Sequence, residues 1–226
     1  MLYKIIVFTL LLFGSQIVNS QKEKDDSLGT WLVVVGNHRV SDKLSIPTVG
    51  TLRNYEFFHH YEFVFVRTGL TYNISPRFNA TFGYAYLDTE PFIESPEALG
   101  AQQHWLYEQL TYKFNWANTR IANRVRVENR WKKEAIGTNL SHRARYRIQL
   151  SKPVLDNFYV KIFDEVFYDL QMGTFNQNRL FLGGGYSFTK KFSIEIGYLK
   201  NHFRSIAFDR LRIAILFKTD LRKNQQ

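Results

Sequence analysis

Six histidines and one Ser-His pair are the first candidates for chemistry in this sequence. A metal site needs two or three histidines that converge with a carboxylate. His59 and His60 are adjacent, so on a strand they would face opposite ways. Ser141-His142 and Asp88 lie near predicted strand ends, as a rim hydrolase would require, but no nucleophile motif surrounds them. We therefore predict no metal, no cofactor and no catalytic residue. The histidines are His38, His59, His60, His104, His142 and His202.

Three consecutive glycines, Gly183 to Gly185, are a second candidate. A phosphate-binding loop places such glycines between a strand and a helix. Here they fall inside a predicted strand, and no helical pattern follows. Glycine within a barrel strand more often marks a bend or the close packing of a large neighbour. We predict a structural role for the triplet.

Arginine at every second position is the strongest pattern in the chain. From Ala122 to Arg130 the even-numbered residues are Ala, Arg, Arg, Glu and Arg, while Val125 and Val127 lie between them. Residues 143–148 repeat the alternation. Because successive strand side chains point to opposite faces, each segment is predicted to have one apolar and one cationic face. That pattern is typical of an outer-membrane barrel strand.

The cationic faces are predicted to point into a barrel lumen. An arginine that faced lipid at mid-membrane would cost about 2–4 kcal/mol, so a row of them must face inward. Carboxylates on neighbouring strands can reach them, and we expect Glu128, Glu165 and Glu195 to do so. Two hypotheses stay open: a lumen plugged by Arg–Glu pairs, or a narrow anion-preferring path lined by surplus arginines. The predicted network comprises Arg124, Arg126, Glu128, Arg130, Arg143, Arg145, Arg147, Arg179 and Arg212.

The predicted fold is all-β, a single antiparallel up-and-down transmembrane β-barrel of about 10–12 strands. No segment with a helical period competes with the strands, although Pro47 weakens one of them because it cannot donate to a ladder. The candidate strands are Trp31–Val40, Lys43–Tyr55, His59–Ile74, Phe78–Asp88, Gln103–Asn115, Thr119–Trp131, Ser141–Ser151, Asn157–Asp169, Arg179–Thr189, Lys191–His202 and Phe208–Asp220.

An odd number of candidates conflicts with the even count that is usual for single-chain bacterial barrels. If both chain ends lie in the periplasm, Trp31–Val40 is one strand too many. Three solutions stay open: ten strands with this segment inside or partly paired, twelve with an unrecognised strand, or a parallel closure. We favour an irregular first segment.

Connections of alternating length predict the orientation. Turns such as Ser75–Arg77 are short and suit the periplasmic side. Thr89–Gln102, Lys132–Leu140 and Leu170–Asn178 are longer and are expected outside the cell.

Aromatic residues make up 16% of the chain and gather near predicted strand ends. We expect them to form interfacial girdles, and an ordinary sandwich core is the alternative. They are Trp31, Tyr84, Tyr86, Trp105, Trp116, Trp131, Phe158, Tyr159, Phe167, Tyr168, Tyr186, Phe188 and Tyr198.

The first twenty residues have the layout of a secretory signal peptide. Lys4 precedes the apolar run Ile5–Phe13, and Val18 and Ser20 suit a cleavage site. The run is too short to span a membrane as a helix. We expect a cleaved signal peptide at 1–20, a flexible leader at 21–27, the barrel at 28–220 and a tail at 221–226.

Composition excludes several classes of protein. Cysteine is absent, so the chain has no disulfides, no thiolate chemistry and no lipoprotein anchor. The net charge is +10, but the basic residues alternate along strands rather than clustering, so nucleic acid is not an expected partner.

The chain resembles the domain-of-unknown-function 2490 family of predicted outer-membrane barrels. The resemblance lies in a Glu/Gln-bearing strand, an Arg-rich strand ending near Glu-x-Arg-Trp and an Arg-x-Arg strand, followed by Asn-Arg-Leu and Gly-Tyr strands. It implies the fold and the location, and it transfers no catalytic residue. The matching residues are Gly69, Gly83, Tyr84, Glu108, Gln109, Arg124, Glu128, Arg130, Trp131, Arg145, Arg147, Asn178, Arg179, Gly197 and Tyr198. One departure is that nine residues follow Phe217, where such barrels commonly end on an aromatic residue.

These observations predict an integral protein of the bacterial outer membrane that is not an enzyme and is either structural or a narrow channel. Its expected partners are the lipid bilayer and the outer-membrane assembly machinery, and any transported solute is left open. The alternatives are a secreted soluble β-barrel that binds a small ligand and an outer-membrane hydrolase with a rim site. A soluble barrel would expose its apolar faces to water, and an apolar ligand would meet a row of cations.

Overall fold

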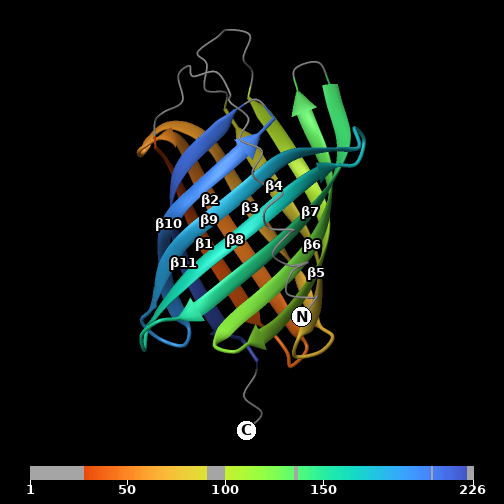
Figure 1. Cartoon of the computed structure of the whole chain (residues 1–226). Helices are drawn as coiled ribbons and strands as arrows, with labels where there is room; N and C mark the ends of the chain where they lie inside the picture. The colour runs from red at the N-terminus through yellow and green to blue at the C-terminus, as the bar shows by residue number, and fades with distance from the viewer. Residues whose placement is uncertain (1–27, 91–99, 135–136, 205, 223–226) are drawn as a thin grey trace, which may run out of the picture.

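The computed structural model describes residues 28–90, 100–134, 137–204 and 206–222. Within them, eleven strands close into one barrel (Figure 1). No helix in these ranges is long and apolar enough to cross a membrane. The predicted signal peptide and leader, the centre of the 89–102 loop and the end of the tail lie outside the described residues. The strands are β1 (Gly29–Arg39), β2 (Leu44–Glu56), β3 (His59–Asn73), β4 (Phe78–Thr89), β5 (Ala101–Trp116), β6 (Thr119–Glu134), β7 (Gly137–Pro153), β8 (Phe158–Asp169), β9 (Thr174–Ser187), β10 (Phe192–Phe203) and β11 (Ala207–Asp220).

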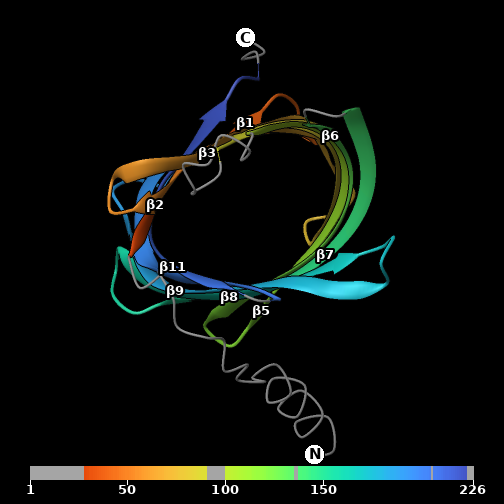
Figure 2. The ribbon, with the colours of Figure 1, turned by 90° about the horizontal axis from the view of Figure 1, so that it is seen from above.

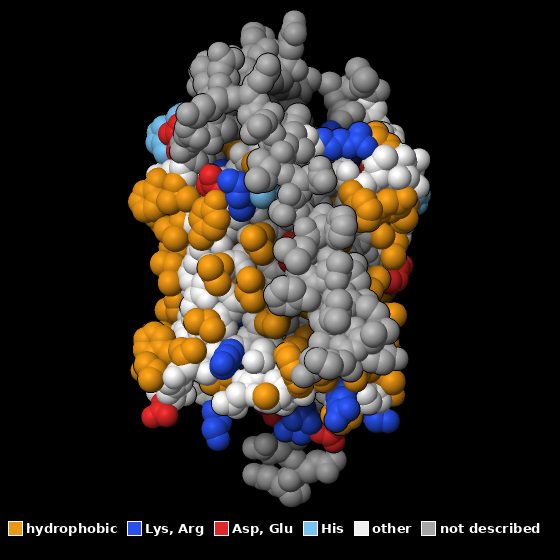
Figure 3. Space-filling view, in the orientation of Figure 1, with side chains coloured by type: hydrophobic (Ala, Val, Ile, Leu, Met, Phe, Trp, Pro, Cys, Tyr) orange, Lys and Arg blue, Asp and Glu red, His pale blue; other side chains and the backbone are white. Residues whose placement is uncertain are grey.

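Each of the eleven predicted segments forms a strand, and the alternation of side chains decides what each face carries. On β3, Val66 and Leu70 point outward and are half exposed, whereas Phe65 and Arg67 line the interior. Figure 3 shows the result on the visible face: hydrophobic side chains cover the wall, and Lys, Arg, Asp and Glu gather mainly towards its two ends. The barrel is therefore apolar outside and charged inside.

The barrel closes through a parallel pair, β1 with β11, in a register that runs from Gly29–Arg210 to Arg39–Asp220. Every other neighbouring pair is antiparallel. The expectation of an irregular first segment is wrong, because β1 is a regular strand with ladder partners on both sides. Of the three solutions to the strand count, the parallel closure is the one that the chain adopts.

Two of the three predicted long loops are shorter than expected. Strand β6 continues to Glu134 and β7 begins at Gly137, and only residues 170–173 separate β8 from β9. The polar residues of the predicted loop pair across the β6–β7 ladder instead, as Lys132 does with Asn139. Polarity alone predicts a loop here, but a strand that rises past the apolar wall can be polar on both faces (Figure 1).

The glycine triplet has the structural role that was predicted for it. A Cβ at Gly183 would collide with the ring of Phe181, and one at Gly185 with the ring of Tyr159. These two rings lie flat over the inner wall only because glycine leaves room beneath them. Gly184 has the opposite parity, and no atom would come nearer than 3.7 Å to its Cβ.

Candidate functional site

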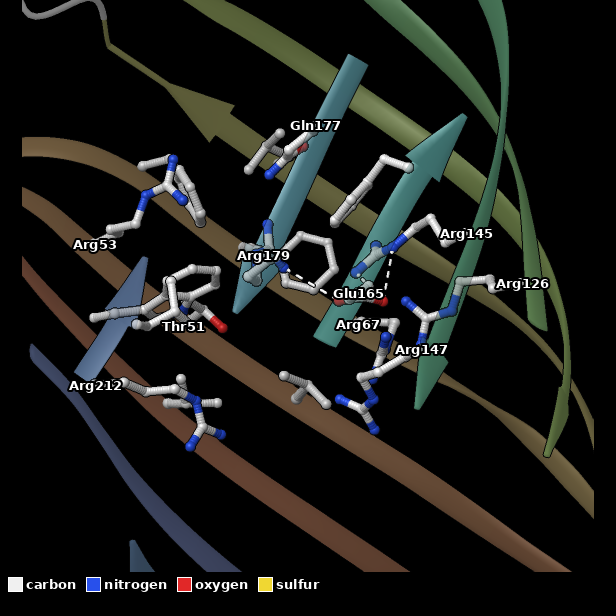
Figure 4. Close-up of a pocket in the computed structure, with 18 of the residues that line it drawn as sticks. Thr51, Arg53, Arg67, Arg126, Arg145, Arg147, Glu165, Gln177, Arg179 and Arg212 are labelled. Carbon is white, nitrogen blue, oxygen red and sulfur yellow. Dashed lines mark hydrogen bonds and ion pairs between the residues drawn. The ribbon is translucent and has the colours of Figure 1, made fainter. Parts of the chain in front are cut away.

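All nine residues of the predicted charge network lie on the inner face of the barrel. Figure 2 looks down the barrel axis and shows the wall that encloses the lumen. The eight arginines of the network line a lumen cavity of about 430 Å³, and the ninth residue, Glu128, is fully buried. Figure 4 shows arginine side chains that reach into this space from several strands. The cavity lining runs from Phe203, at the loop end of β10, to Gln149 and Leu216, nearer the turn end.

Glu128 on β6 accepts ion pairs from two sides. Arg143, which lies directly opposite it on β7, brings Nη2 to 2.5 Å from Oε2. Arg145 brings Nη1 to 2.6 Å from Oε1. Arg126 is farther away, with Nη1 at 3.4 Å from Oε1, and it donates mainly to the side-chain oxygen of Gln109. A carboxylate with no solvent exposure is thus balanced by more positive charge than it carries.

Glu165 on β8 is the second carboxylate surrounded by arginines, and Arg145 pairs with both Glu165 and Glu128. Arg145 places Nη2 2.9 Å from Oε1 of Glu165. Arg124 pairs with the same oxygen, and Arg179 lies 3.6 Å from Oε2. The dashed lines around Glu165 in Figure 4 mark such contacts. Arg145 on β7 thus lies between two buried glutamates, one on each of the strands that flank β7.

Two further glutamates anchor cations on the other side of the barrel. Glu62 pairs with Arg53 and, at 3.1 Å, with Arg210. Glu195 pairs with Lys161 and, at 3.2 Å, with Arg212.

Sequence reasoning missed Glu62 because strict alternation assigns it to the outer face. The register of β2 and β3 shifts between Arg53 and Asn54, so that Phe63 and Tyr61 face consecutive residues of β2 and Glu62 is the extra residue of a bulge. A bulge turns the side chain inward, and nothing in the local sequence marks it. Arg53 and Arg67 were also missed, because each is the only arginine in its strand.

Aromatic rings separate the guanidinium groups inside the lumen. Arg53 lies over Phe63 at 4.1 Å and over Trp31 at 4.9 Å, and Arg179 lies over Trp31 at 4.5 Å and over Phe167 at 4.9 Å. Such cation–π contacts hold like charges apart and fix their orientation.

Some of the predicted girdle residues are therefore assigned to the wrong surface. Trp31, Trp105 and Phe167 are buried in the interior. Arginines from other strands stack on these rings. Position along a strand does not distinguish an inner ring from an outer one. Other members of the predicted girdle, such as Trp116 and Phe158, are exposed.

Positive charge is in excess inside the lumen. Ten arginines and one lysine line the cavity against three glutamates, and Glu128 beside it makes four, an excess of seven. In the described part of the chain, Arg67, Arg130 and Arg147 have no carboxylate within ion-pair distance. The Nε atom of each is buried and finds no acceptor there. This arrangement can hold or attract an anion.

A family model described as "Protein of unknown function (DUF2490)" matches residues 28–212. The chain belongs to this DUF2490 family. A solved structure similar to the DUF2490 chain is an anion-selective porin from Comamonas acidovorans, with 13% identity and a TM-score of 0.39. That match covers 79% of this chain and 53% of the porin, so the chain spans about half the length of the porin. No curated protein matches.

One prediction about the histidines of this DUF2490 chain is wrong. His59 and His60 do not face opposite ways, because His60 has a φ of +50° and its Nδ1 comes within 2.9 Å of that of His59. A carboxylate oxygen of Glu56 lies 3.1 Å from the Nδ1 of His60. These three possible ligands sit together at the β2–β3 hairpin, where both histidines are exposed.

The Ser-His pair is divided between two faces of the barrel wall. His142 lies opposite Asn129 and donates a hydrogen bond of 2.7 Å from Nδ1 to its Oδ1. Ser141 has the other parity and pairs with Arg130 of the lumen. A serine nucleophile and its base must share one face, which these two residues do not.

A cluster of charges closes the seam at the turn end of the barrel. Arg222 contacts Asp220 at 2.6 Å and Asp42 at 2.7 Å, and Arg39 contacts Asp42 at 2.9 Å. These residues connect the end of β11 with the β1–β2 turn beside the parallel pair.

The seam cluster predicts the titration of one carboxyl group. Hydrogen bonds from Arg222 lower the pKa of Asp220 to about 2. Because the folded-state pKa is depressed, the contribution to stability is present above the unfolded value and is lost as the pH falls through about 2. We expect Arg222→Gln to raise the pKa of Asp220 towards its ordinary value, measured by a ¹³C carboxyl NMR titration. An unchanged pKa in Arg222→Gln would contradict this assignment.

Proposed function

We propose that this chain is an integral outer-membrane barrel whose lumen admits and holds small anions. The observation that supports it most is the excess of seven positive charges around the cavity. Cations that line a narrow space concentrate anions electrostatically and exclude cations. Four glutamates orient most of the arginines, and Arg67 and Arg147, which have no carboxylate partner in the described residues, lie over the rings of Tyr107 and Phe163.

Membrane insertion is supported by the outer face. Strands of 11 to 17 residues are long enough to cross a bilayer core when tilted. Their outward side chains include the exposed Val34, Phe82, Leu182 and Ile196. Covering this surface with water would be unfavourable for a soluble barrel, whereas lipid covers it without cost. We accordingly place the protein in the outer membrane, with the bilayer and the assembly machinery as partners.

We also propose that the protein is not an enzyme. The support is that Ser141 and His142 occupy opposite faces, and that the buried charged groups are engaged with one another rather than poised around a nucleophile. Recovery of the expressed chain in the soluble periplasmic fraction would favour the secreted ligand-binding barrel instead.

Anion preference is expected when the refolded protein is inserted in a planar bilayer under a KCl gradient. The sign of the reversal potential measures it. Replacing both Arg67 and Arg147 with glutamine removes two cations that have no carboxylate partner, so it should reduce the preference without breaking an ion pair. Arg222→Gln, at the rim, is the matched control and should leave the reversal potential unchanged.

Cation preference in the wild type would overturn the proposal. A wild type that inserts but carries no current would support the plugged structural barrel in its place.

Glu108 tests whether the outer face lies in lipid. It is exposed on β5, and Leu70, Phe82, Leu110 and Val125 surround it. A carboxylate there costs less than the 2–4 kcal/mol of a cation, so we expect Glu108→Leu to stabilise the barrel in lipid vesicles by about 1 kcal/mol. Urea unfolding followed by tryptophan fluorescence measures the change. A soluble barrel would instead become more prone to aggregation.

A further inference from the structure

We propose that the anion held in the lumen carries an apolar group, as an aryl or short-chain alkyl carboxylate, sulfonate or monoester does. This inference rests on the proposed function and specifies its ligand. It follows from the placement of an apolar wall next to the arginines that have no carboxylate partner.

The apolar wall is built by β1, β2 and β8 to β11. Its buried members include Trp31, Val33, Phe163 and Phe181, which form one packed cluster. Three partly buried side chains, Val35, Val49 and Leu216, pack against this cluster and line the cavity. They leave apolar surface facing the space that an ion would enter.

The apolar wall adjoins the arginines that have no carboxylate partner among the described residues, Arg67 and Arg147, at two places. In the ladder, Leu216 is the partner of Val35, Val35 of Val49, and Val49 of Arg67, so the row of aliphatic side chains ends on a guanidinium group. From β7, Arg147 lies over the ring of Phe163 at 5.2 Å. A ligand that contacts either arginine therefore also touches the apolar wall.

The cationic end of this space is defined by three arginines. Arg67 and Arg126 both lie over the ring of Tyr107, at 5.4 and 4.9 Å. Figure 4 shows Arg67, Arg126 and Arg147 gathered on one side of the lumen, beside Glu165. Arg126 donates to Gln109 and has a 3.4 Å contact with Glu128, and the Nε atoms of Arg67 and Arg147 find no acceptor in the described residues.

A bare inorganic anion satisfies only half of this site. It would neutralise the guanidinium groups but leave the valines and Leu216 in contact with water. An anion with an apolar substituent covers that surface as well, and removing apolar surface from water is favourable. A cavity of about 430 Å³ accommodates a small ligand of this kind.

Isothermal titration of the refolded barrel in a non-ionic detergent tests the proposal, with empty micelles as the blank. The probes are naphthalene-1-sulfonate, methanesulfonate and 1-naphthylmethylammonium. We expect naphthalene-1-sulfonate to bind about tenfold or more tightly than methanesulfonate, and the ammonium probe to show no saturable binding.

Two pairs of variants separate the apolar and charged contributions. Val49→Thr keeps the side-chain volume and should weaken naphthalene-1-sulfonate about fivefold while sparing methanesulfonate. Val66→Thr, on the outer face, is its control. Arg67→Gln should weaken both anions about tenfold, since a charge-assisted contact is lost. Arg77→Gln, in an exposed turn, is the control for that change.

Equal affinities for the two sulfonates, or binding of neither probe, would overturn this inference while leaving an anion preference in the conductance experiment intact. Binding of the ammonium probe as tightly as the sulfonate would also overturn it, because charge would then not select the ligand. Failure of the proposed function is distinguishable, since it appears as cation preference in the bilayer.

Discussion

Glutamine in place of Glu128 is expected to lower the free energy of unfolding by about 3–5 kcal/mol. Glu128 has no solvent exposure, and the ion pairs with Arg143 and Arg145 measure 2.5 and 2.6 Å. Glutamine keeps the shape but removes the charge, so the buried arginines would then repel one another. Urea unfolding in detergent, followed by tryptophan fluorescence, measures the loss.

Asp42→Asn is the control for Glu128→Gln. Asp42 also contacts two arginines, Arg39 and Arg222, but it lies exposed at the rim. Exposed ion pairs contribute about 0–1 kcal/mol. Combining Glu128→Gln with Arg143→Gln should restore part of the loss, since one uncompensated cation is removed. A loss below about 1 kcal/mol in the single variant would contradict the role of Glu128 as an anchor.

Alanine at Gly83 is expected to destabilise the barrel by about 1–3 kcal/mol or to prevent its assembly. A Cβ at this position would overlap the backbone oxygen of Thr68 and the ring of Tyr107. The ring can move, but a ladder carbonyl cannot move without distorting β3. Heat-modified migration on electrophoresis reports the folded fraction, and urea unfolding gives the energy.

Gly50 offers the matched control for Gly83. It lies in β2, and no atom comes within 4 Å of the Cβ that alanine would add. Gly50→Ala should therefore be neutral or should stabilise the strand by about 0.5–1 kcal/mol. Equal stability of the two alanine variants would show that the close approach at Gly83 is not required.

The strands were predictable because the side chains of each one alternate between an apolar outer face and a polar or charged inner face. The alternation of arginine with valine or isoleucine in β6 and β7 was enough to assign the faces of Arg124, Arg126 and Arg145. The alternation within a strand does not show which charged residues pair with each other across the barrel. Glu62 reaches Arg210 across 148 positions of sequence, and a bulge in β3 reverses its parity.

Closure and strand ends were harder for physical reasons. An isolated β1 has the same alternation whether its last neighbour runs parallel or antiparallel to it, so the sequence of that strand does not decide between them. Likewise, polar residues at 132–140 belong equally well to a loop or to a hairpin that rises above the apolar wall. The inner position of Trp31 and Trp105 depends on arginines that come from other strands, and composition near a strand end does not reveal it.

Because the number of strands is odd, the first strand begins at one rim of the barrel and the last strand ends at the other. Because β1 and β11 run side by side in the same direction, the backbone enters the wall at the rim where Gly29 lies and leaves it at the rim where Asp220 lies. Gly29 and Asp220 thus lie at opposite rims, which would face opposite compartments once the barrel spans a bilayer. Labels placed at Gly29 and at Asp220 would therefore report on different sides of the same membrane, whereas the two ends of an even-stranded barrel lie on the same side.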